Sequence, residues 1–88
     1  MVAPAQLGPE AIDSLGAAIY RGWITPEIES REYGRFVVFD VVSRDHEIAD
    51  SDLEASDRLA SRRPEGVFWG TRVGRNAAYQ VRRGHNRQ

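Results

Sequence analysis

Cysteine and lysine are both absent from this chain of 88 residues, and it has only two histidines. Without cysteine there is no disulfide, no thiolate ligand for a metal and no thiol nucleophile. No apolar run approaches the roughly 20 residues that cross a bilayer, and residues 1–8 lack the basic and then apolar layout of a secretion signal. We therefore expect a cytoplasmic protein that makes no membrane contact.

A length of 88 residues provides for one small domain, and a hydrophobic content of 41% is enough for a real core. We expect a flexible leader over residues 1–8, a single α+β domain over residues 9–83 and a flexible tail over residues 84–88. Folding at this size buries roughly 60–65% of the surface of the unfolded chain. The domain should therefore be only modestly stable unless two chains associate.

The charges are divided unevenly along the chain. Residues 1–57 hold twelve carboxylates and four arginines, a formal charge of −8, whereas residues 58–88 hold eight arginines and one glutamate, a formal charge of +7. The total of −1 therefore conceals a dipolar sequence. Such a division is typical of proteins that meet a charged partner or a second copy of themselves.

The first part of the chain predicts a helix that is interrupted and then restarts. Pro9 and Glu10 are favoured in the first turn of a helix, and apolar residues follow at spacings of three and four. The predicted apolar face consists of Ala11, Ile12, Leu15, Ala18 and Ile19. Thr25 before Pro26 is typical of a new helix start, so the helix should kink or restart there and end by Gly34.

The strongest strand pattern lies in the middle of the chain. After Arg35, the residues of the stretch 35–42 are β-branched or aromatic on both faces except at Asp40, which predicts a strand in the centre of a sheet. A turn over residues 43–45 and a short returning strand over residues 46–49 should follow. Two further strands are predicted over residues 67–73 and 77–82.

A second helix is predicted between these two pairs of strands. Ser51 and Glu54 form a capping box at its start, and it should run over residues 52–63 and bury Leu53 and Leu59. The order predicts an α+β fold: an N-terminal helix followed by a ββαββ unit, with a four-stranded, mostly antiparallel sheet in the order 2-1-3-4 and the second helix on one face. Either the first helix or a second copy of the chain should cover the other face.

A distinctive pattern covers residues 19–81, about two thirds of the chain. It consists of Ile19, Tyr20, Ile24 and Pro26, then YGRFVVFDVVSRDHEIADSDLEASDRLASRRPEGVFWGTRVG, then AAYQV. This pattern resembles an uncharacterised family of small bacterial α+β proteins. The resemblance implies a strand with an aspartate, a short acidic strand, a helix ending in arginines and proline, and a strand ending in Arg-Val-Gly. It implies no catalytic residue and no ligand, although such short proteins are similar to one half of a two-gene pair, as antitoxins are.

The acidic residues between positions 45 and 57 are the densest group of possible metal ligands. Their spacing matches no calcium loop, and those on the helix do not all share a face. Asp50 and Asp52 are also favoured beside a helix N-terminus. We therefore interpret the run as a solvated helix start with no metal. No cofactor is expected either, because the glycines form neither a phosphate loop nor a dinucleotide fingerprint.

His46 lies between two carboxylates, an arrangement that suggests a general base. No nucleophile accompanies it, because Ser43 and Ser51 occupy turn and cap positions. We therefore interpret His46 as a surface histidine and expect no catalytic residue. Asp40 interrupts an apolar strand and needs a partner if it is buried, and Arg72 on the neighbouring strand is the predicted partner.

The C-terminal arginines are the best candidates for a binding site. The candidate residues are Arg72, Arg75, Tyr79, Arg82 and Arg83. Arginine and aromatic side chains together suit a protein interface, and they also suit single-stranded nucleic acid through phosphate contacts and base stacking. The acidic part of the chain would repel a polyanion, which favours a protein partner.

We therefore expect a non-enzymatic protein–protein interaction module that acts as a homodimer or as one half of a two-protein pair. The alternative is a nucleic-acid-binding or antitoxin-like regulatory protein that uses the arginine hairpin. An enzyme is disfavoured, because the chain is small and shows no triad, metal constellation or cofactor motif.

Overall fold

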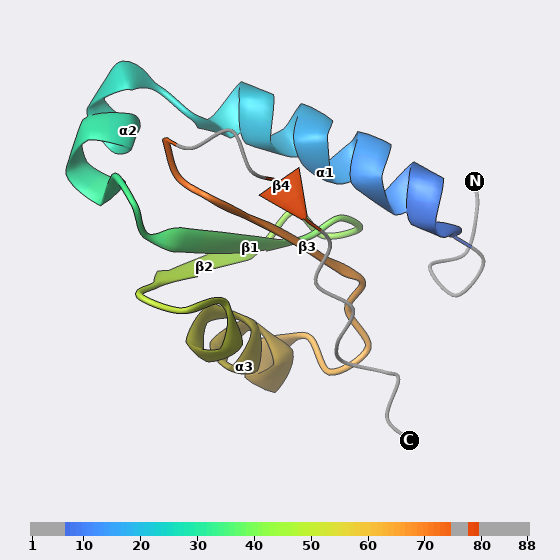
Figure 1. Cartoon of the computed structure of the whole chain (residues 1–88). Coiled ribbons are helices and arrows are strands. Elements are labelled where there is room, and N and C mark those ends of the chain that lie inside the picture. The colour runs from blue at the N-terminus through green and yellow to red at the C-terminus, as the bar shows by residue number, and fades with distance from the viewer. Residues whose placement is uncertain (1–6, 75–77, 80–88) are drawn as a thin grey trace.

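A computed structural model describes residues 7–74 and 78–79 of the chain (Figure 1). Its helices are α1 (Pro9–Trp23), α2 (Pro26–Glu32) and α3 (Asp52–Arg62). Its strands are β1 (Phe36–Asp40), β2 (His46–Ala49), β3 (Phe68–Arg72) and β4 (Ala78–Tyr79). All strand pairs are antiparallel, and the order across the sheet is β2-β1-β3-β4. The expected class, helices combined with an antiparallel sheet, is confirmed.

The end of the sheet at β4 is described only in part. Of the strand predicted over residues 77–82, the structure describes Ala78 and Tyr79, which lie opposite Thr71 and Gly70 of β3. The remainder of that prediction lies outside the described residues. So do most of the expected leader and all of the expected tail.

The sheet lies between two helices of the same chain, with α1 on one face and α3 on the other (Figure 1). Successive residues of β1 point to opposite faces, so Val37 and Phe39 enter the core beneath α1 while Val38 enters the core beneath α3. This double covering explains why β1 is apolar on both faces, as the sequence predicts. Of the two covers expected for the second face, the first helix or a second copy of the chain, the structure shows the first helix of the same chain.

The predicted helix starts are confirmed by their caps. The Thr25 hydroxyl accepts the backbone N–H of Ile28 at 3.1 Å, and the Ser51 hydroxyl accepts that of Glu54 at 3.1 Å. The prediction that α3 buries Leu53 is wrong, because this side chain is 55% exposed. The buried residues of α3 are Ala55, Ser56 and Leu59.

The inward face of α1 agrees in part with the predicted one, because Ile12 and Ile19 pack against the core as expected, whereas its other members do not. Leu15 is 37% exposed, and Ala11 and Ala18 are exposed as well. Instead Gly16 is buried, because the side chain of Trp69 occupies the space beside it, where a Cβ would lie 2.1 Å from Cγ of the ring. The Trp69 Nε1–H also donates to the Asp13 carboxylate at 2.9 Å. The close approach of glycine and tryptophan therefore sets the rotation of α1 about its axis.

Candidate binding site

The arginine hairpin predicted from the sequence lies largely outside the described residues. Arg75, Arg82 and Arg83 are not described, and nor is the side chain of Tyr79. The guanidinium carbon of Arg72 lies 4.5 Å from the centre of the Phe36 ring, so Arg72 packs on an aromatic side chain of its own sheet. The hairpin stays a prediction.

The predicted pairing of Asp40 with Arg72 is wrong, and the register of the sheet explains why. Asp40 lies opposite Phe68, and Arg72 lies opposite Phe36 at the other end of β1. Asp40 is 4% exposed, and the donors that its carboxylate accepts within the described part of the chain are all uncharged. The donors are the Ser43 hydroxyl at 2.8 Å and the backbone N–H groups of Val67 at 3.1 Å, Val42 at 3.3 Å and Ser43 at 3.4 Å.

The Asp40 carboxylate holds the turn between β1 and β2 in shape. Bonds from an aspartate to the N–H two residues on are a standard turn device. The turn is closed by the N–H of Arg44 to the Asp40 carbonyl at 2.7 Å and by the N–H of Asp40 to the Asp45 carbonyl at 2.9 Å. Within it Arg44 has a φ of 70°, the left-handed region that residues other than glycine and asparagine rarely adopt.

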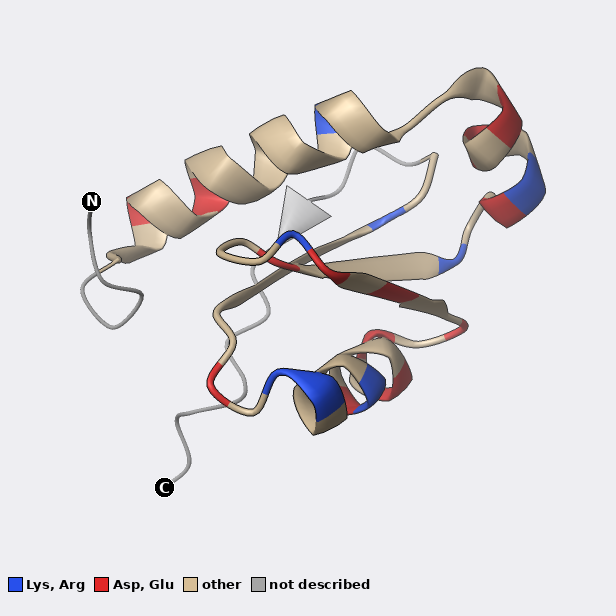
Figure 2. Cartoon of the chain, turned by 180° about the vertical axis from the view of Figure 1, so that it is seen from behind, with Lys and Arg blue, Asp and Glu red and all other residues tan. Residues whose placement is uncertain are grey.

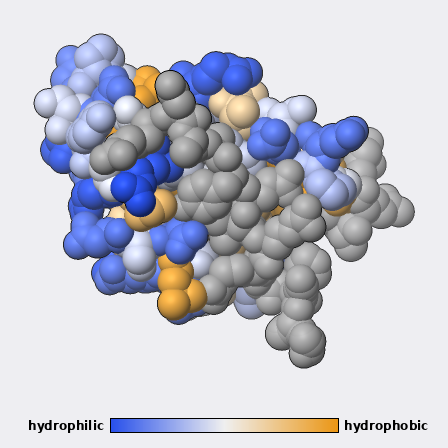
Figure 3. All heavy atoms as spheres, in the orientation of Figure 1, coloured by the Kyte–Doolittle hydropathy of each residue, from blue (hydrophilic) through white to orange (hydrophobic). Residues whose placement is uncertain are grey.

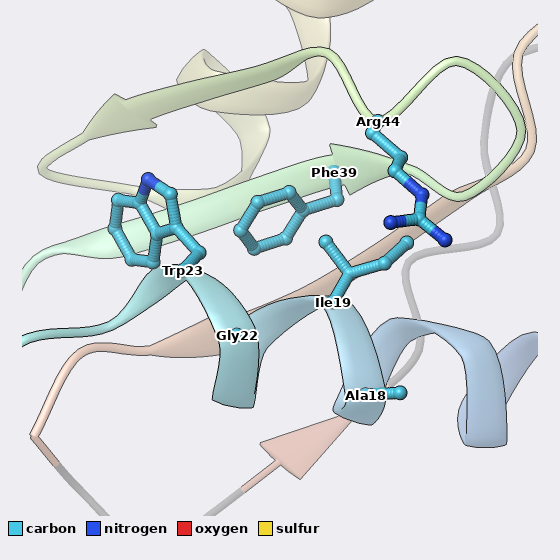
Figure 4. Close-up of a pocket in the computed structure, with 6 residues that line it drawn as sticks. All are labelled: Ala18, Ile19, Gly22, Trp23, Phe39 and Arg44. Carbon is cyan, nitrogen blue, oxygen red and sulfur yellow. The ribbon is translucent and has the colours of Figure 1, made fainter.

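The turn directs Arg44 over an apolar cavity of about 280 Å³. We call this cavity the Arg44 pocket; it is lined by Ala18, Ile19, Gly22, Trp23, Phe39 and Arg44. In Figure 4 the guanidinium of Arg44 extends from the turn toward Ile19, with the Phe39 ring on the strand behind them and Trp23 at the end of α1. Phe39 is buried, whereas Ala18 and Gly22 are exposed, so the pocket opens to solvent. Helix α1, β1 and the turn therefore jointly build it.

His46 belongs to the wall of aromatic residues beside this pocket and is not the surface histidine that the sequence suggests. It lies opposite Phe39 in the sheet, and its ring centre is 5.5 Å from that of Phe39 and 5.3 Å from that of Trp23. The Trp23 and Phe39 rings meet edge to face at 5.4 Å. Three rings in mutual contact make this side of the pocket stiff.

The acidic residues beside the turn are paired with arginines of α3. Arg62 donates to both oxygens of Asp45 at 3.0 Å and also contacts Glu47, and Arg63 donates to Asp45 at 3.2 Å. The hydrogen bond from Arg62 is the main reason that the pKa of Asp45 is lowered to about 2. The same contacts raise the pKa of Arg62. Figure 2 shows acidic and basic positions close together on α2 and on α3.

Arg44 differs from these arginines because its side chain makes no hydrogen bond or ion pair with the described residues. Other arginines of this part are engaged: Arg35 with Glu32 and Asp50, Arg58 with Glu54, and Arg31 with Glu32. Arg21, in the last turn of α1, is exposed and unpaired in the same sense, but it does not line the pocket. Among the described residues Arg44 is therefore an unpaired cation at the rim of a pocket whose other lining residues are uncharged.

A second cavity lies on the other side of the turn but has less to offer a ligand. Its volume is about 320 Å³, and its lining includes Asp40, Arg62 and Arg63. Asp40 is already engaged with the turn and both arginines with Asp45, and Glu65 is the remaining charged residue of the lining. The face of the molecule seen in Figure 3 shows hydrophobic residues only as small separate spots among hydrophilic ones, where described residues are visible.

Residues 7–74 and 78–79 contain neither a metal-binding cluster nor a membrane-spanning helix. Within these ranges no three histidine, aspartate or glutamate side chains gather as they would around a metal ion. Nor is any helix there both long enough and apolar enough to cross a membrane.

No family model, no curated protein and no solved structure matches this chain. The resemblance to a family of small bacterial proteins therefore stays a prediction. The Arg44 pocket itself was missed in the sequence, because Trp23, Phe39 and Arg44 belong to three separate elements there. The available signal is the spacing of Asp40 and Ser43, which is typical of a turn held by a carboxylate.

Proposed function

We propose that this protein is a non-enzymatic interaction module that docks on a partner protein through the Arg44 pocket. The observation that carries this proposal is the guanidinium of Arg44, which has no partner among the described residues and lies at the pocket. The turn places it there by holding the backbone of Arg44 at a φ of 70°. A left-handed residue of this type costs about 1–2 kcal/mol. Such strained positions concentrate at sites of function, where the surrounding structure enforces them.

The size of the pocket favours one side chain over a larger ligand. Small-molecule sites usually have volumes of about 300–1,000 Å³, whereas a cavity of about 150 Å³ already holds a benzene ring. A volume of about 280 Å³ therefore suits a single aromatic or large apolar group together with a small polar one. Interfaces between proteins concentrate their binding energy in such anchors, and arginine and tryptophan are enriched there.

The chemistry of the lining residues argues for binding and against catalysis. Of the six residues, Arg44 alone is ionisable, and a guanidinium stays protonated in proteins, so it is neither an acid nor a base at neutral pH. The nearby carboxylates of Asp40 and Asp45 are both engaged in structural bonds. A positive charge beside an apolar surface attracts an anion that carries an apolar group.

The partner that we propose is a second protein. One ground for a homodimer was a sheet face without a cover, and α1 covers that face within one chain. The other ground, the uneven division of charge along the chain, suits a second protein equally well. Nucleic acid is less favoured, because phosphate contacts at α3 would compete with the ion pairs that Arg62 and Arg63 form with Asp45. The undescribed arginine hairpin is the remaining basis for a nucleic-acid function.

A nuclease-treated pull-down from the native host tests this proposal with matched variants. The full chain should capture a stoichiometric protein partner. Arg44→Ala should lose this partner, whereas Arg21→Ala should retain it, because Arg21 does not line the pocket. The two variants are matched, since each removes an exposed arginine without a partner among the described residues. Equal capture by Arg44→Ala and the native chain would overturn the proposal. Loss of all captured material on nuclease treatment would favour nucleic acid. Loss only in a chain carrying Arg75→Glu and Arg82→Glu would move the interface to the hairpin.

A further inference from the structure

We infer that the Arg44 pocket receives the last residue of a partner chain, with an aromatic or large apolar side chain in the pocket and the terminal carboxylate on the Arg44 guanidinium. This inference rests on the proposed function and specifies the chemistry of the partner. It commits to a chain end, as distinct from an internal acidic segment or a free small acid.

The charge at the pocket selects a carboxylate. The guanidinium is planar and offers parallel N–H donors that match the two oxygens of a carboxylate. None of the residues that line the pocket is acidic, so no group of the lining competes for Arg44. The nearest acidic side chain along the chain, Asp45, is held by Arg62 and Arg63.

The geometry of a chain end fits this arrangement better than an internal segment does. In a terminal residue the side chain and the carboxylate leave the same Cα atom, so one residue fills the pocket and pairs with Arg44. In an extended internal segment, neighbouring side chains point to opposite faces. An aspartate or glutamate next to an apolar anchor would therefore turn away from Arg44.

The outer edge of the sheet beside the pocket is protected, which disfavours docking of an extended internal strand there. β2 is the outer strand on this side. Its carbonyl oxygens at His46 and Ile48 accept side-chain N–H groups from Arg62 at 3.1 Å and Arg58 at 3.5 Å. Charged side chains along an edge strand are a known protection against the addition of further strands. Recognition of a chain end needs no such edge.

The backbone of the turn and the aromatic wall beside the pocket are held in place by contacts within the chain. Asp40 fixes the turn that carries Arg44, and the Trp23, Phe39 and His46 rings support one another. A preformed site loses less conformational freedom when its ligand binds. A short peptide end can therefore bind it without a large interface.

The test uses four probes and the full chain, and follows the indole N–H of Trp23 by nuclear magnetic resonance. The probes are acetyl-glycyl-phenylalanine, its C-terminal amide, acetyl-phenylalanyl-glycine and 3-phenylpropionate. The free acid of the first peptide should bind about tenfold more tightly than the amide, because a hydrogen bond to a charged group contributes more than a neutral one. The indole of Trp69, which is buried and bonded to Asp13, should not shift and serves as an internal control.

Three variants separate the roles of charge and shape. Arg44→Ala should abolish the preference for the acid over the amide, and Arg21→Ala should keep it. Gly22→Leu should prevent binding of both peptides, because Gly22 lines the pocket. This change should leave the fold intact, since no atom lies within 4 Å of a Cβ added at Gly22.

Several results would overturn the inference. Equal binding of acid and amide, or an acid preference that survives in Arg44→Ala, would exclude the carboxylate contact. Equally tight binding of acetyl-phenylalanyl-glycine would exclude the terminal residue as the anchor. Equally tight binding of 3-phenylpropionate would assign the pocket to a free small acid. If no probe binds while partner capture still requires Arg44, the chain end is rejected and docking stands. If capture is independent of Arg44, the proposed function itself fails.

Discussion

Replacing Gly16 by alanine should destabilise the protein, although alanine is the better helix former. A Cβ at this position would lie 2.1 Å from Cγ and 2.6 Å from Cβ of Trp69. These atoms belong to the base of a side chain that is 1% exposed and bonded through its nitrogen to Asp13, so α1 and β3 must move apart. Overpacking of this kind costs about 1–3 kcal/mol or more, against a gain in helix propensity of up to about 1 kcal/mol. We expect a net loss of about 2 kcal/mol.

Gly22→Ala on the same helix is the matched control. Nothing lies within 4 Å of a Cβ added there, so this variant should gain up to about 1 kcal/mol from helix propensity. In a domain of this size about 1 kcal/mol shifts the melting temperature by about 4–8 °C. The two variants should therefore melt more than about 10 °C apart in circular dichroism, with the same order in urea unfolding.

A second background isolates the contact itself. When Trp69→Ala removes Cγ and the ring, Gly16→Ala should be much less destabilising, because only the contact with Cβ of residue 69 remains, and the two substitutions should be strongly non-additive. If Gly16→Ala is as stable as Gly22→Ala in the native background, the close approach of α1 to Trp69 is refuted.

Three further predictions concern the turn and its surroundings. Arg44→Gly should raise the free energy of unfolding by about 0.5–1 kcal/mol, because glycine accepts the left-handed conformation, whereas Arg44→Ala should leave it nearly unchanged; equal unfolding midpoints in urea would show that no strain is stored. Asp40→Ala should cost at least about 2 kcal/mol in the same assay, because it leaves the buried N–H of Val67 without its acceptor; a loss below that of Ser43→Ala would contradict the role of the carboxylate. The pKa of Asp45 is lowered to about 2 in the folded chain, mainly by Arg62, against about 3.9 when unfolded. The stability that Asp45 contributes is therefore present above about pH 4 and lost as the pH falls to about 2, so Asp45→Asn should flatten the pH dependence of unfolding in that range.

Local chemistry made much of the fold predictable. The helix starts at Pro9, Pro26 and Asp52 follow from proline and hydroxyl caps, which depend only on neighbouring residues. The central position of β1 follows from its apolar character on both faces. Such signals do not depend on how the elements pack, so they survive in the finished structure.

The predictions that proved wrong concern features that are decided by the packing of the elements against one another. The 3.6-residue period places Leu15 and Ile19 near one face of α1, but it cannot tell that Trp69 requires the glycine at position 16 and thereby turns Leu15 outward. The pairing of Asp40 failed for a similar reason, because the register of β1 against β3 is set by the whole sheet. Its carboxylate instead serves the backbone of the adjacent turn.

The candidate site was the least predictable feature. The charge pattern favours the C-terminal arginines, whereas among the described residues the unpaired cation that lines a pocket is Arg44, a turn residue with no distinguishing pattern in the sequence. Its importance depends on a backbone conformation and on contacts between α1, β1 and the turn. The turn leaves one signal in the sequence, the spacing of Asp40 and Ser43, but the contacts between α1 and β1 leave none.

The most direct test of the binding role of Arg44 is to map the surface of the labelled full chain that changes when the captured partner is added. Docking at the Arg44 pocket predicts the largest nuclear magnetic resonance shifts at the Trp23 indole, the Ile19 methyl groups and the Arg44 side chain. Shifts concentrated around residues 70–74 beside the arginine hairpin, with Trp23 unchanged, would contradict it.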